Sequence, residues 1–115
     1  MAVAAGYALC FLLIAGCDGP CGNQEVQRMA SPTGEWTAIS FNRDCGATTK
    51  ATTQVSILRR TASLPNEPGN VLVLEGQSAV KLSLSSADEL LIELPPGAKW
   101  LKQEAVVNGI RVRYR

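Results

Sequence analysis

The chain has 115 residues, enough for one small domain, with 11 Lys and Arg against 10 Asp and Glu. This near balance provides neither a basic field that would attract nucleic acid nor an acidic one for a basic partner. The sequence contains no histidine, so it lacks the commonest general base and the commonest metal ligand. We therefore expect no nucleic-acid binding, no metal site and no other cofactor.

The first 17 residues, MAVAAGYALCFLLIAGC, contain no charged side chain, and the first charge is Asp18. The 16 residues before Cys17 would span about 24 Å as a helix, less than the ~30 Å hydrocarbon core of a bilayer. A run this short that ends in small residues is typical of a secretory signal rather than of a membrane span. The sequence therefore predicts a signal peptide over residues 1–16.

The segment Ile14-Ala15-Gly16-Cys17 resembles the lipobox of bacterial lipoproteins, in which an apolar residue and two small residues precede a cysteine. The resemblance implies that a peptidase cuts before Cys17 and that Cys17 carries acyl chains. Each buried methylene contributes about 0.8 kcal/mol, so two or more chains would hold the protein firmly to a membrane. The alternative is an ordinary cleaved signal peptide with a chance cysteine at this position.

If Cys10 leaves with the signal peptide and Cys17 is lipidated, Cys21 and Cys45 are the remaining thiols. An even pair in an exported chain usually forms a disulfide, because the compartment is oxidising. Such a bridge would contribute ~3–4 kcal/mol in the chain-entropy model. Two cysteines without histidine cannot supply the ligands of a zinc site. A redox pair would show two intervening residues at a helix start, a spacing that Cys17 and Cys21 do not have.

The segment from Asp18 to Ala30 is rich in Gly, Pro and polar residues, which predicts that residues 17–30 form a lipidated tether. A turn at Ser31–Gly34 then opens one β domain over residues 31–115. Short alternating or apolar segments bounded by turn residues predict strands, at residues 36–41, 53–57, 71–74, 80–84 and 90–94.

The first of these strands places Ile39 and Phe41 on one face and Trp36 and Ala38 on the other. Near the carboxyl end, Asn108-Gly109 predicts a tight hairpin because both residues tolerate positive φ. The fold class is therefore all-β, a small antiparallel sheet or sandwich of about six to seven short strands. One helical turn over residues 98–103 is an alternative for that segment.

Several phrases together look like a family of small, uncharacterised bacterial exported proteins and lipoproteins; they are CGN (21–23), SPTGEW (31–36), RDCGATT (43–49), TQVSIL (53–58) and GNV (69–71). The likeness covers nearly all of the mature chain. It implies export to the cell envelope and makes Cys21 and Cys45 the natural disulfide partners. The family has no established activity, so the resemblance implies none.

Asp44, Thr48 and Thr49 beside Cys45 form the most site-like cluster, since a carboxylate and two hydroxyls can bind a small polar ligand or a peptide. The alternative is a loop whose side chains cap their own backbone.

Arg111, Arg113 and Arg115 alternate with apolar residues and so share one sheet face. Such a basic face suits phosphate groups of anionic lipid. The alternative is a charged exposed or edge strand that prevents edge-to-edge aggregation.

The sequence does not favour catalysis, because a serine nucleophile would need a base and no histidine is present. We predict a membrane-anchored lipoprotein of the bacterial cell envelope, facing the periplasm or the exterior, that binds or supports another envelope protein. The alternatives are a small-ligand or enzymatic site over residues 44–49, and an inhibitor of an external hydrolase that uses the loop over residues 64–70.

Overall fold

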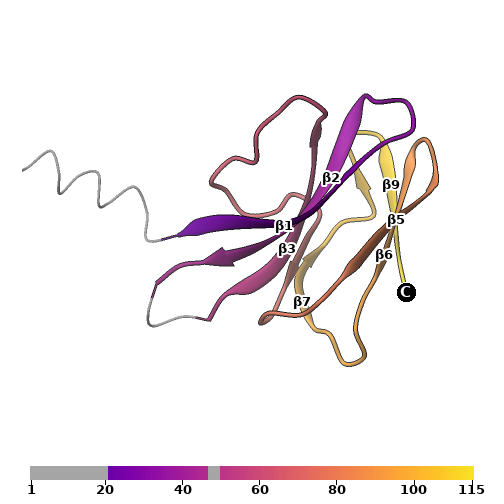
Figure 1. Ribbon diagram of the computed structural model, residues 1–115. Helices are drawn as coiled ribbons and strands as arrows, with labels where there is room; N and C mark the ends of the chain where they lie inside the picture. The colour runs from indigo at the N-terminus through magenta and orange to yellow at the C-terminus, as the bar shows by residue number, and fades with distance from the viewer. Residues whose placement is uncertain (1–20, 47–49) are drawn as a thin grey trace, which may run out of the picture.

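The computed structural model describes residues 21–46 and 50–115, which form nine strands and no helix. Five strands make sheet A, in the order β1 (Gly22–Ala30), β2 (Trp36–Asp44), β3 (Thr52–Arg59), β4 (Leu72–Leu74) and β7 (Trp100–Gln103). Four make sheet B, in the order β5 (Lys81–Ser86), β6 (Glu89–Glu93), β9 (Ile110–Tyr114) and β8 (Val106–Val107). The two sheets pack against each other (Figure 1), which confirms the all-β fold class with more strands than expected.

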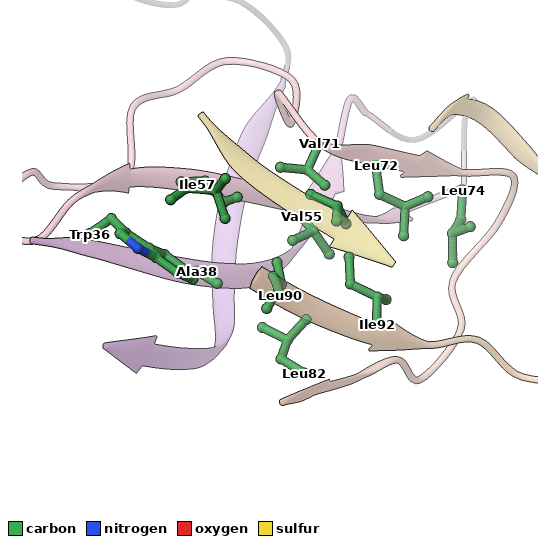
Figure 2. Close-up of a cluster of buried hydrophobic side chains, with 12 residues drawn as sticks. Trp36, Ala38, Val55, Ile57, Val71, Leu72, Leu74, Leu82, Leu90 and Ile92 are labelled. Carbon is green, nitrogen blue, oxygen red and sulfur yellow. The ribbon is translucent and has the colours of Figure 1, made fainter. Parts of the chain in front are cut away.

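The core lies between the sheets and is built mainly from apolar residues at every second position of the strands (Figure 2). Sheet A contributes Trp36, Ala38, Val55, Ile57, Leu72 and Leu74, and sheet B contributes Leu82, Leu90, Ile92, Ile110 and Val112. Val71, directly before β4, completes the cluster. Because successive side chains of a strand point to opposite faces, this alternation places one face of each sheet in the core. The Trp36 indole also donates a hydrogen bond across the core to the Ala87 carbonyl at 3.1 Å.

Sheet A is buried on its second face as well, by the segment that connects β3 to β4. Ile39 and Phe41 lie on the face opposite Trp36 and Ala38, as predicted. This face points away from the core between the sheets, yet both residues are fully buried. On the same face, Gln54 accepts a hydrogen bond from the Gly69 amide and Ser56 accepts one from the Asn70 amide. Residues 60–70 therefore lie across this face; we call them the covering loop.

The tether predicted to run to Ala30 is wrong from Gly22 onward, because β1 pairs with β2 from Gly22↔Asp44 to Ala30↔Thr37. β1 is an edge strand with mostly exposed side chains, and an irregularity beside Val26 interrupts its register. An edge strand held by backbone hydrogen bonds needs no buried face, so its sequence lacks the alternation that marks a strand. Cys17 and the predicted signal peptide lie outside the described residues.

The helical alternative over residues 98–103 is also wrong, since β7 occupies Trp100–Gln103 and pairs with β4, and residues 98 and 99 are not helical. The predicted hairpin is confirmed, with positive φ at Asn108 (50°) and Gly109 (81°) between β8 and β9. The expectation of purely antiparallel pairing holds for six of the seven strand pairs, while β6 and β9 run parallel. β9 lies inside sheet B, between β6 and β8.

Candidate functional site

The predicted disulfide is confirmed: the sulfur atoms of Cys21 and Cys45 are bonded at 2.00 Å. The bridge joins the residue before β1 to the residue after β2, next to the pair Gly22↔Asp44. It therefore closes the open end of the β1–β2 hairpin covalently, opposite the turn at Ser31–Gly34.

Asp44 caps its own backbone, since its Oδ1 accepts a hydrogen bond from the Gly46 amide at 3.0 Å. This is the geometry of the alternative, self-capping interpretation of the cluster. Thr48 and Thr49 lie outside the described residues. Asp44 also lines none of three surface hollows of about 290, 270 and 430 Å³ that the described residues form.

A polar network that the sequence did not predict lies beside the disulfide. The Arg43 guanidinium donates to the side-chain oxygens of Asn23 and Asn66, each at 2.9 Å. Asn66 donates to the Cys21 carbonyl at 3.0 Å, and Asn23 donates to the carbonyls of Pro65 and Glu67. The network fixes the covering loop to the start of β1. Each hydrogen bond joins residues at least 20 positions apart in the sequence, so no local sequence pattern could predict the network.

Arg111, Arg113 and Arg115 share the outer face of sheet B, as predicted, while Ile110 and Val112 point into the core. Because β9 is not an edge strand, protection of a free edge does not explain these charges.

Carboxylates accompany two of the three arginines. Arg111 Nε lies 3.8 Å from a Glu89 oxygen, and Arg115 Nε lies 3.8 Å from a Glu93 oxygen. Lys81 approaches the other oxygen of Glu93 at 4.0 Å. Arg113 sits between these pairs, level with Leu91 and Ser83 on the neighbouring strands. Among the described residues, no carboxylate oxygen lies within 4.0 Å of the Arg113 side-chain nitrogens.

Four cations thus share this face with two carboxylates; we call the set Lys81, Glu89, Glu93, Arg111, Arg113 and Arg115 the cationic face. Glu89 is nearly buried, and its carboxylate accepts a short hydrogen bond from the Ser85 hydroxyl. A shallow hollow of about 270 Å³ beside Arg113 is lined by Ser85, Glu89 and Leu91. The cationic face therefore has a shallow hollow, a net positive charge and, at its centre, a guanidinium that pairs with no carboxylate of the residues described.

Tyr114, the last residue of β9, is turned the other way. Its hydroxyl donates to the Glu104 carbonyl at 2.7 Å. Burial raises the pKa of the phenol well above its ordinary value, and the nearby Glu104 carboxylate adds to the shift.

No group of three or more His, Cys, Asp or Glu side chains within residues 21–46 and 50–115 is arranged to hold a metal ion. In the same ranges, no helix is long and apolar enough to cross a membrane. Comparisons with known protein families, with curated proteins and with solved structures found no match.

Proposed function

We propose that this chain is a lipid-anchored binding module of the bacterial cell envelope, held to a membrane through Cys17 and acting through its cationic face. The observation that carries the proposal is the position of this face relative to the start of the folded domain. In Figure 1, β1 begins at the left, whereas β5, β6 and β9 lie at the right. A module anchored just before β1 would present the cationic face away from its anchor.

Two features support the envelope location. The lipobox-like segment ends at Cys17, four residues before Cys21. Cys21 is itself oxidised to a disulfide, and disulfides persist in oxidising compartments such as the periplasm. The resemblance to exported bacterial proteins, expected from the sequence, points the same way.

The charge of the face favours an acidic surface on another envelope protein as the partner. Arg111 and Arg115 already have carboxylate neighbours, whereas Arg113 offers its donors to an incoming group. A guanidinium binds a carboxylate through two parallel hydrogen bonds, which adds geometric selectivity to charge attraction. Leu91 beside it is half-buried and supplies apolar contact area. We therefore favour recognition of a protein over catalysis.

The anchor is tested by replacing Cys17 with serine in cells fed labelled palmitate. We expect the unaltered protein to carry label and to sediment with membranes, and C17S to lose both properties, because serine provides no sulfur for acylation. Export is checked separately by the oxidation state of Cys21 and Cys45, which the substitution should not alter. An unaltered protein that carries no label and stays soluble would refute the anchor.

The cationic face is tested with a photo-crosslinking residue at Ser83, which lies in the same cross-strand row as Arg113. We expect one acidic envelope protein to be crosslinked from this position and not from a control position at Arg60, which is exposed elsewhere on the chain. Arg113→Glu should reduce the yield at least tenfold, because charge reversal replaces attraction with repulsion, and added salt should reduce it as well. Equal crosslinking from both positions, or a yield that Arg113→Glu leaves unchanged, would contradict the assignment.

The two other hypotheses each require a feature that differs from the observed geometry. A ligand site at residues 44–49 would use the Asp44 carboxylate, which instead caps Gly46. An inhibitor would present a protruding loop at residues 64–70, where hydrogen bonds to Asn23, Arg43 and Gln54 hold the chain against sheet A.

A further inference from the structure

The edge of sheet A formed by β7 exposes two large apolar side chains in succession. Trp100 is 51% exposed and Leu101 is 67% exposed, and neither belongs to the core. Lys99 precedes them and Lys102 follows, both exposed. An indole and an aliphatic side chain flanked by lysines combine an apolar body with charged ends, as in segments that lie at a membrane–water interface.

The register of sheet A places this pair at the same end of the strands as the disulfide. Trp100 pairs with Leu74 in β4. The register of β4 with β3, extended by one residue, places Leu74 beside Thr53. Asn42 pairs with both Thr53 and Gln24, and Gln24 is the third residue after Cys21. Four strand spacings of about 4.8 Å separate β1 from β7, so the two points are roughly 19 Å apart across the sheet.

The anchor reaches only a short distance from this end. Cys17 is four residues before Cys21, and four residues span at most ~14 Å even when extended. The covering loop and the disulfide fix the start of β1 to the folded domain, so β1 cannot detach and lengthen the tether. Acyl chains on Cys17 would therefore hold this end of sheet A at the bilayer surface.

We propose that the membrane itself covers Trp100 and Leu101: the end of sheet A that carries Cys21 rests on the bilayer, with the β7 edge in the headgroup layer. This inference rests on the proposed anchor at Cys17 and adds a second, weaker contact to it. The tether raises the local concentration of bilayer at the β7 edge, so a contact too weak to bind alone becomes occupied. Lys99 and Lys102 favour anionic headgroups in that position. The cationic face then points away from the bilayer.

The test supplies the anchor chemically, so that it does not depend on lipidation in cells. In the chain from Cys17 onward, with Cys21 and Cys45 oxidised, Cys17 is the free thiol and couples to maleimide lipid in vesicles. The vesicles contain phosphatidylglycerol and phosphatidylcholine with brominated acyl chains, which quench nearby indoles. The chain has two tryptophans, and Trp36 is only 7% exposed, so quenching reports on Trp100.

We expect coupled protein to lose at least half of the Trp100 emission, and the quenching to disappear in Trp100→Phe. Leu101→Ser and a spacer of twelve Gly and Ser residues inserted after Asp18 should each reduce the quenching at least twofold, because one removes apolar contact and the other lengthens the tether. Absence of quenching in coupled protein, or quenching that survives Trp100→Phe, would overturn the inference. So would dimerisation of uncoupled protein that shields Trp100, since a second copy would then be the partner. None of these outcomes alters the palmitate result, which tests the natural anchor on its own.

Discussion

Gly69 occupies a place in the covering loop where the backbone leaves no room for a side chain. A Cβ built there would lie 2.6 Å from the Val55 carbonyl oxygen and 2.9 Å from that of Leu72. Both are backbone atoms of the sheet, so they cannot swing aside as a flexible side chain would. The Gly69 amide also donates to Gln54 at 2.7 Å, which fixes the loop at this close approach.

We predict that Gly69→Ala lowers the free energy of unfolding by about 1–3 kcal/mol, because the added methyl group forces backbone apart. Gly22→Ala is the matched control, since a Cβ at Gly22 meets nothing within 4 Å and its effect should stay within about 0.5 kcal/mol. Urea unfolding of both variants measures the difference. Equal stabilities of the two variants would contradict the close packing of Gly69 against the sheet.

Tyr114 provides a pH-dependent prediction. Because the folded pKa of its phenol is raised, the folded state keeps the proton above pH 10, where the unfolded chain releases it. Stability is therefore complete below pH ~10 and falls as the pH rises above the unfolded value. We expect the melting temperature of the unaltered domain to fall more steeply between pH 9.5 and 11 than that of Tyr114→Phe, which loses about 1 kcal/mol of hydrogen bonding at all pH values.

Absorbance offers a direct check of this shift. Tyr7 lies in the predicted signal peptide, so Tyr114 is the only tyrosine in the chain from Cys17 onward. Tyrosinate absorbance in the folded domain should rise only above pH ~10, and in urea it should rise near that value. Coincident titrations in the folded and unfolded states would show that the phenol is not shielded.

Among the elements, the β1–β2 hairpin depends on the disulfide more than any other, because β1 contributes almost no buried side chain. We predict that Cys21→Ala with Cys45→Ala lowers the free energy of unfolding by ~3 kcal/mol. Amide exchange should accelerate most in β1 and in the covering loop, which Asn66 fastens to the Cys21 carbonyl, and least in β6 and β9. Chemical reduction of the unaltered protein is the control and should give the same exchange pattern. A uniform increase over all strands would contradict a local role for the bridge.

The elements also divide into those that the sequence predicted and those that it did not. β5 alternates apolar and polar residues because one of its faces packs in the core, and Leu90 and Ile92 of β6 continue that buried face at every second position, which made both strands predictable. β1 and β7 are edge strands, whose residues are largely exposed, so hydrophobic alternation is absent. The burial of Gln54 and Ser56 was equally hidden, since it depends on the covering loop and not on their own strand.

For the whole molecule, the sequence predicted the fold class but not the arrangement of strands. The parallel pair β6–β9 joins segments that are about twenty residues apart, and it forms because the chain crosses to sheet A at β7 and returns at β8. Sequence periodicity shows which face of a strand is buried but not which strand lies beside it. For the same reason, the shared face of Arg111, Arg113 and Arg115 was predictable, whereas the position of Glu89 and Glu93 beside two of them was not.

The closed hairpin has a mechanical consequence if the chain is pulled from the anchor that we propose at Cys17. A force applied ahead of Cys21 passes through the disulfide directly to Cys45. The chain between these two cysteines, which are 24 positions apart, therefore bears no load. The hydrogen bonds between β1 and β2 therefore cannot be unzipped from the tethered end while the bridge is intact. Under such a pull, the oxidised domain would unfold first at β3 and beyond, and only a reduced domain would lose β1 first.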